Sequence, residues 1–268
     1  MNITIIYDVN PLPHSLLNFV FYFGDLTEEA EKKYIRNIIK GSLLQFFEEY
    51  KDKEKLNKGD FAKIHNLAID LIVSSQDFIR KNNDKSSVSL YEIKRFDIFF
   101  KFFTNYLTER KKILTYQLEI KRIEEDQKNE FYINLTKKDI QIYSIILSVF
   151  VCYYLRIPYN IERKELAEIL SKILEKYDKN YGDFLDLPIK EEEFIAENIE
   201  MKSGIAKNRA LLDNLFALFV AINTKVPIFI VGKPGSSKSL SVQLIYKAMR
   251  GNSSNKLFFK NYPKIVMS

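Results

Sequence analysis

Residues 228–240, IFIVGKPGSSKSL, restrict the possible folds more than any other part of the chain. The first four residues are apolar and largely β-branched, which predicts a buried strand, and a helical pattern begins at Leu240. The loop between them approaches the phosphate-binding pattern G-x-x-x-x-G-K-[ST]. Strand, loop and helix in this order are the context such a loop requires, because its backbone N–H groups then point at a phosphate at the helix N-terminus.

One letter departs from the pattern, because Ser237 stands where glycine is expected. Glycine there permits close backbone approach without a Cβ, and serine fits if its φ stays negative. Lys238 is predicted to bridge the terminal phosphates of ATP, and the Ser239 hydroxyl to ligate Mg²⁺. The alternative is a coincidental turn before a helix. The predicted nucleotide-binding residues are Gly232, Lys233, Pro234, Gly235, Ser236, Ser237, Lys238, Ser239 and Leu240.

Most of the remaining chain reads as helix. Only 8 glycines and 7 prolines occur in 268 residues. Because these residues interrupt helices, their scarcity favours long helices. Thr27 is predicted to cap one helix, and Ser89 and Glu92 stand in capping-box register at the start of another. Helices are predicted at about residues 60–81, 89–107, 138–155 and 161–177, with a charged, exposed helix at 108–127.

Three segments break this helical pattern. Residues 3–7 form a short β-branched run that predicts a lone strand. Residues 181–208 lose clear periodicity and are interpreted as an extended connector. The final residues, 257–268, are predicted to form a loop and the beginning of a second strand.

The distribution of charges and the single cysteine argue against some functions and cellular compartments. The 41 basic and 35 acidic residues are interspersed, which is typical of solvated helix faces and argues against a nucleic-acid interface. The acidic runs at 124–126 and 191–193 are interpreted as solvated surface. The single cysteine, Cys152, is predicted to be a small buried hydrophobe in a reducing compartment.

No targeting or membrane segment is expected. The N-terminus lacks a basic leader, and the uncharged run at residues 142–155 is shorter than the roughly 18 residues that span a bilayer. That run is interpreted as a buried helix. The predicted location is cytoplasmic.

Residues 204–251 resemble the third AAA+ unit of mysterin-type proteins, giant dynein-like AAA+ ATPases that carry a RING-type E3 ubiquitin ligase module. The resemblance rests on the segment GIAKN, the helix followed by an apolar strand, and the loop GKPGSSKSL. It implies that Ser237 is the family's own variant of the loop. It also implies that ATP and Mg²⁺ are bound and that residues 205–208 approach the adenine.

Earlier segments are similar to the lid of a preceding AAA+ unit. Residues 9–26 resemble the family's strand-to-lid junction, and 87–103, SVSLYEIKRFDIFFKFF, resemble its lid helix SLRDVxR. Arg95 matches the final arginine of that motif, whereas Tyr91 replaces the earlier one. Residues 147–170 resemble a family helix with a Cys-Tyr pair.

The predicted fold class is therefore mostly α. A helical AAA+ lid subdomain and connector (residues 1–180) and a linker (181–203) precede the first strand, P-loop and helix of an incomplete α/β AAA+ large subdomain (204–268). The Walker B motif, sensor, arginine finger and RING are expected outside the chain. The resemblance implies neighbouring AAA+ units and ubiquitin-pathway proteins as partners. The alternatives are a non-hydrolysing helical scaffold with a vestigial P-loop and a P-loop kinase.

Overall fold

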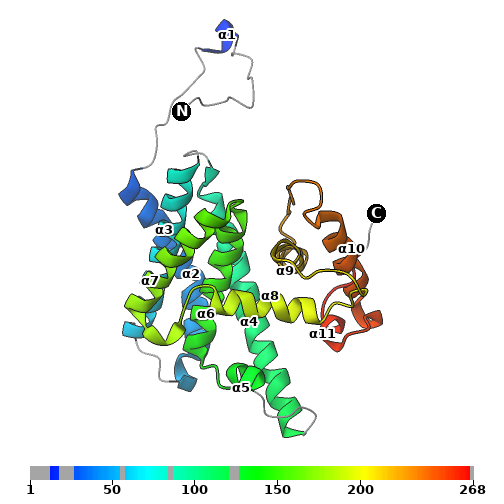
Figure 1. Ribbon diagram of the computed structural model, residues 1–268. Coiled ribbons are helices and arrows are strands. Elements are labelled where there is room, and N and C mark those ends of the chain that lie inside the picture. Colours follow the sequence, from blue (N-terminus) through cyan, green and yellow to red (C-terminus); the bar gives the residue numbers. More distant parts are fainter. Residues whose placement is uncertain (1–12, 18–26, 55–57, 84–86, 121–126, 266–268) are drawn as a thin grey trace.

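The computed structural model describes residues 13–17, 27–54, 58–83, 87–120 and 127–265. These residues form helices, turns and loops, with no strand among them, which confirms the mostly α fold class (Figure 1). The strand predicted at 3–7 and most of 9–26 lie outside the described residues. The α-helices are α1 (His14–Leu17), α2 (Glu28–Glu54), α3 (Lys58–Asn82), α4 (Tyr91–Glu119), α5 (Gln127–Ile133), α6 (Lys137–Cys152), α7 (Asn160–Tyr177), α8 (Asp186–Glu197), α9 (Arg209–Thr224), α10 (Lys238–Ala248) and α11 (Leu257–Lys260).

Helices α2 to α7 pack into one helical body around α4 and α6 (Figure 1). Phe96, Phe100 and Phe103 lie at spacings of four and three residues on one face of α4 and are at most 2% exposed. Phe103 stacks on Phe216 of α9 with ring centroids 6.0 Å apart, so the core continues from the helical body into the following segment.

The predicted cap at Thr27 is confirmed, whereas α4 has Leu90 at its N-cap with no side-chain cap, so the capping box predicted at Ser89 and Glu92 is only half formed. Thr27 Oγ1 accepts the Ala30 N–H at the start of α2. Thr136 and Asp139 form a complete capping box at the start of α6. Before α4, the Glu92 carboxylate accepts hydrogen bonds from the backbone N–H and hydroxyl of Ser89. Local sequence therefore sets where these helices begin.

Helix α6 is the buried helix that the apolar run predicts. The stretch Lys137–Arg156, which adds a short 3₁₀ turn to α6, is long and apolar enough to cross a membrane, but 78% of its most apolar window is buried inside the protein. Such burial is what a core helix shows. Cys152 at its end is 4% exposed, and burial raises the pKa of its thiol.

Two predictions for the charged segments are wrong. Helix α4 continues to Glu119, so part of the separate helix predicted at 108–127 belongs to it. Helix α8 forms within the segment that was predicted to be an extended connector. Its inward face carries Leu187, Glu191 and Ile195 at spacings of four residues, and the buried glutamate in this stripe hides the apolar periodicity of the helix.

Glu191 is not a solvated surface residue, because it is fully buried. Its carboxylate pairs with Arg110 at 2.6 Å and accepts hydrogen bonds from Tyr106 at 2.6 Å and Tyr132 at 2.5 Å. The Arg110 guanidinium also lies 3.6 Å from the ring centres of Tyr132 and Phe194. Burial, followed by the Glu191 charge, raises the pKa of both tyrosines, so they stay neutral donors.

Glu192 is equally buried but points to a different cluster. It contacts Arg209 of α9, which in turn lies 2.7 Å from Asp213. The contacts of the Glu192 oxygens lack hydrogen-bond geometry. Burial raises the pKa of Glu192, and the attraction of Arg209 does not offset this. We therefore interpret Glu192 as a protonated carboxyl group at neutral pH.

The charge state of Glu192 gives a pH-dependent stability. A raised pKa means that the folded protein holds a proton which the unfolded chain releases above its ordinary pKa of about 4.5. The contribution of Glu192 to stability is therefore full below this pH and falls as pH rises toward the raised pKa. Relative to wild type, Glu192→Gln should gain up to about 1.4 kcal/mol of unfolding free energy per pH unit across this window.

Urea denaturation of the two proteins between pH 5 and pH 9 measures this difference. Glu193→Gln is the matched control, since Glu193 is the exposed neighbour on α8. Parallel stability curves for wild type and Glu192→Gln would show that Glu192 is ionised.

Helices α8 to α11 form the C-terminal part of the structure, with α9 between α8 and α10 (Figure 1). Two predictions fail here. Residues 228–231 form no strand, and Phe229 and Val231 are more than 90% exposed, because no strand among the described residues pairs with them. Residues 257–260 form α11 instead of a loop, with Phe259 fully buried.

Candidate functional site

The predicted nucleotide-binding residues lie together in one loop at the N-terminus of α10. Helix α9 ends at Lys225, whose left-handed conformation turns the chain, and Val226 N–H donates back to the carbonyl of Ala221. Residues 226–233 have no regular secondary structure and lead to a turn at Pro234 and Gly235. A loop followed by a helix is thus present, whereas the strand predicted before the loop is not formed in the described residues.

Lys238 holds the loop closed. Its ammonium group lies 2.6 Å from the carbonyl oxygen of Gly232, 2.8 Å from that of Lys233 and 3.1 Å from Ser236 Oγ. These three acceptors are neutral, and no carboxylate among the described residues pairs with the Lys238 charge. The loop therefore surrounds a cation at the start of a helix, and both features favour an anion.

Ser237 adopts a conformation that the sequence analysis did not expect. Its φ is +58°, in the left-handed region, whereas serine was predicted to fit with a negative φ. The glycine of the general pattern has no Cβ to clash there, so Ser237 takes the same backbone shape with strain. Gly235, at φ +82°, has open space around the position of a Cβ.

Ser237→Gly should remove this strain and raise the free energy of unfolding by about 1 kcal/mol. Ser237→Val should lower it, because a β-branched residue is disfavoured at positive φ. Urea denaturation of the three proteins tests the order glycine, serine, valine. Ser236→Gly is the control, since Ser236 has no positive φ and glycine should not stabilise there. A glycine variant less stable than wild type would refute the strained conformation.

The first turn of α10 has free hydrogen-bonding capacity. Ser237 forms no side-chain cap, and the first N–H groups of a helix have no acceptor within it. These donors belong to Lys238, Ser239 and Leu240. The Ser239 side chain is exposed, whereas the Leu240 side chain packs against the hydrophobic core, so Leu240 can offer a ligand only its backbone. The N–H groups of the first turn of α10 are therefore suitable hydrogen-bond donors for a phosphate group.

The segment predicted to approach the adenine lies before α9. Asn208 caps α9, since its side-chain oxygen accepts the Leu211 N–H at 2.9 Å, and Ile205 packs partly buried against the core. The backbone of 205–208 is therefore held by the same helix that contacts the loop. Its role toward adenine stays a prediction.

Asn214 is a residue of the site that the sequence analysis missed. Its side-chain amide, on α9, donates to the carbonyl oxygen of Ser236 at 3.1 Å. No sequence signal singles it out, because one asparagine in an apolar helix has no fixed partner until the fold places the loop beside it.

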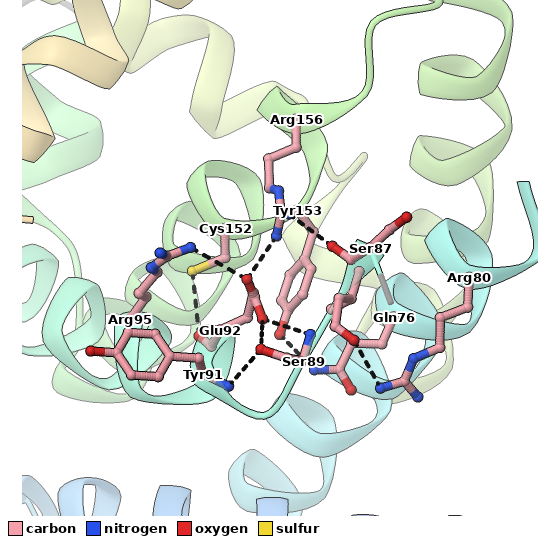
Figure 2. Close-up of polar contacts among 11 residues, drawn as sticks. Gln76, Arg80, Ser87, Ser89, Tyr91, Glu92, Arg95, Cys152, Tyr153 and Arg156 are labelled. Atoms are coloured by element: carbon pink, nitrogen blue, oxygen red, sulfur yellow. Dashed lines mark hydrogen bonds and ion pairs between the residues drawn. The ribbon is translucent and has the colours of Figure 1, made fainter. Parts of the chain in front are cut away.

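The predicted lid arginine lies in a separate cluster around Glu92 (Figure 2). Arg95 lies 3.3 Å from the Glu92 carboxylate and 5.5 Å from the ring centre of Tyr91, and Arg156 lies 3.1 Å from the same carboxylate. Burial alone would raise the pKa of Glu92, but hydrogen bonds from Ser89 and the Arg156 charge hold it below its usual range. The structure does not bring Arg95 into contact with the loop.

The same cluster ties several helices together (Figure 2). Arg156 donates to the Ser87 carbonyl oxygen, Gln76 donates to the buried Tyr153 hydroxyl, and Cys152 contacts the Glu92 carbonyl oxygen at 3.9 Å. Cys152 is thus a packed, protonated thiol, as predicted. The cluster stabilises the start of α4 and resembles no catalytic arrangement among the described residues.

Comparison with known proteins places the loop in a family. Residues 204–268 match the family described as the RNF213 AAA domain. Human E3 ubiquitin-protein ligase RNF213 is 30% identical over 265 residues, which is 97% of this chain. The chain is RNF213-like along almost its whole length. The RNF213 protein of the mouse is 28% identical over 264 residues, and zebrafish E3 ubiquitin-protein ligase rnf213-beta is 29% identical over 265.

The RNF213 similarity extends beyond the AAA domain. The family match begins at Gly204, just before α9, and includes the loop and α10, whereas the similarity to the whole relatives also covers the helical body. The chain spans only about 5% of the length of human RNF213. Residues 204–268 are thus similar to an AAA-type domain, and the relatives matched along almost the whole chain are E3 ubiquitin ligases by name.

Proposed function

We propose that residues 232–240 are the phosphate-binding loop of an AAA+ ATPase unit and bind ATP with Mg²⁺. The observation that carries this proposal is the closure of the loop around the Lys238 ammonium group, directly before the uncapped first turn of α10. The match of residues 204–268 to an AAA domain supports the same role, because AAA domains in general bind ATP.

The main residues of the loop have different roles in this proposal. Lys238 exchanges its carbonyl acceptors for phosphate oxygens, and the first-turn N–H groups of α10 supply further donors. Gly232 and Gly235 allow the backbone to approach the ligand, and the exposed Ser239 hydroxyl ligates Mg²⁺. Bound ATP would supply the phosphoanhydride bond whose hydrolysis drives AAA+ machines.

The proposed domain organisation follows from this site. Residues 1–180 would be the helical lid and connector of the preceding AAA+ unit, and 204–268 the start of the next unit. The intervening segment, 181–203, is largely helical and contacts both sides through α8. Residues 228–231 would pair with further strands of the complete unit, which would cover Phe229 and Val231.

The partners proposed for the parent protein are inferred from the names of its relatives. We propose that the parent protein is cytoplasmic, contains neighbouring AAA+ units and acts with ubiquitin-pathway proteins, as the E3 ligase name of the relatives implies. The test of the nucleotide role is ATP binding by the full-length protein and by its Lys238→Ala variant. Reduced affinity in the variant supports the proposal, and unchanged affinity would favour the scaffold alternative.

A further inference from the structure

We propose that Asn214 is a positioning residue for the phosphate loop, and that the helical body holds it in place through Asp213. This inference rests on the proposed function for the role of the loop, but not for its geometry. The Asn214 amide donates to the Ser236 carbonyl oxygen at 3.1 Å. Every other hydrogen bond of residues 232–237 in the described chain stays within the loop or runs to α10.

The bond to Ser236 fixes one peptide plane. In a planar trans peptide, the C=O and the N–H point in opposite directions. Because Asn214 holds the Ser236 carbonyl toward α9, the N–H of Ser237 points away from α9. The Ser236–Ser237 peptide also precedes the strained φ of +58° at Ser237. Asn214 therefore stabilises the loop shape that presents this N–H as a donor.

The neighbouring residue anchors α9 to the helical body. Successive residues on a helix point about 100° apart, so Asp213 and Asn214 face different partners. Asp213 is 8% exposed and pairs with Arg163 of α7 at 2.5 Å. Arg163 in turn donates to the carbonyl oxygen of Ile157 at 2.7 Å.

A second contact fixes the same face of α9. Asp213 also pairs with Arg209, which contacts the buried Glu192 of α8. Two helices of different segments, α7 and α8, thus fix the rotation of α9 that aims Asn214 at the loop.

The matched pair Asn214→Leu and Asn223→Leu tests this role. Asn223 lies on the same helix, but its amide donates to the Phe219 carbonyl oxygen of α9 itself. Hydrogen exchange in the nucleotide-free protein is measured for the peptide that covers residues 232–240, in which the Ser236 N–H, bonded to the Lys233 carbonyl oxygen, is the amide that reports on the loop. Asn214→Leu should speed this exchange about fivefold, which is the effect of losing one typical hydrogen bond. Asn223→Leu should leave it unchanged.

A second substitution, Arg163→Met, should affect the loop indirectly, through Asp213 and the position of α9. Arg163→Met removes the partner of Asp213 and should also speed exchange at 232–240, by a smaller factor. In Asn214→Leu the midpoint of thermal unfolding should stay close to that of Asn223→Leu, and the affinity for ATP should fall several-fold.

The outcomes separate the two proposals. Unchanged loop exchange in Asn214→Leu would overturn the positioning role, as would a uniform increase throughout α9 and α10 with a lower unfolding midpoint. Absence of ATP binding by the wild-type protein would overturn the proposed function, while the exchange measurement would still decide whether Asn214 holds the loop.

Discussion

Glu191→Gln should lower the free energy of unfolding by about 3–5 kcal/mol, the usual cost of removing one partner from a buried ion pair. The substitution keeps the size of the side chain but removes the charge that faces Arg110. Arg110 is only 12% exposed and lies close to the rings of Tyr132 and Phe194, so water replaces the lost carboxylate poorly. The hydroxyls of Tyr106 and Tyr132 also lose a charged acceptor.

Urea denaturation of the 268-residue chain at neutral pH measures this loss. Glu193→Gln, one position from the buried pair of glutamates on α8, should change the free energy of unfolding by less than about 0.5 kcal/mol. A loss below about 1 kcal/mol in Glu191→Gln would show that Arg110 finds another partner or that the site is hydrated.

The different environments of the three neighbouring glutamates, residues 191–193, could not be predicted from the sequence. Their letters are identical, yet Glu191 is paired with Arg110, Glu192 contacts Arg209, and Glu193 is exposed. The partners lie on α4 and α9, far away in sequence, so no local pattern distinguishes the three. Reading them as solvated surface also hid α8, because two of its buried positions looked polar.

Helices with an apolar stripe were predictable. Residues 60–81, 138–155 and 161–177 were predicted as helices and correspond to α3, α6 and α7, because apolar spacing and caps act locally. The strand at 228–231 was also predicted from local pattern, but a strand needs a pairing partner. None of the described residues supplies one, so the segment forms no strand and is largely exposed.

The candidate loop was predictable in position and only partly in shape. Its letters located the turn and a helix directly after it, but α10 begins at Lys238, two residues before the predicted start at Leu240. The positive φ of Ser237 was not expected, because the preference of serine for negative φ is outweighed by the closure of the loop around Lys238. Asn214 could not be predicted, since its contact depends on how α9 packs beside the loop.

Lys238→Ala should weaken ATP binding by about 10- to 100-fold. A hydrogen bond to a charged group is worth about 1.5–3 kcal/mol, and alanine removes both the charge and the donors. Lys238 is the residue whose ammonium group the loop encloses, so its loss affects the centre of the site. Lys247→Ala is the matched control, since Lys247 is an exposed lysine of the same helix.

The Ser239→Ala variant distinguishes loss of Mg²⁺ ligation from a change in the structure of the loop. It leaves the contacts of Lys238 in place and should reduce affinity only when Mg²⁺ is present. A reduction of equal size without Mg²⁺ would argue against Ser239 as a metal ligand.

The most direct measurement is the equilibrium dissociation constant of ATP and Mg²⁺ for the full-length protein, determined side by side for wild type, Lys238→Ala and Lys247→Ala. If residues 232–240 bind the phosphates, only Lys238→Ala loses affinity, and it loses about 10-fold or more. If all three proteins bind ATP equally well, the loop is not a nucleotide site, and the chain contributes a helical scaffold instead.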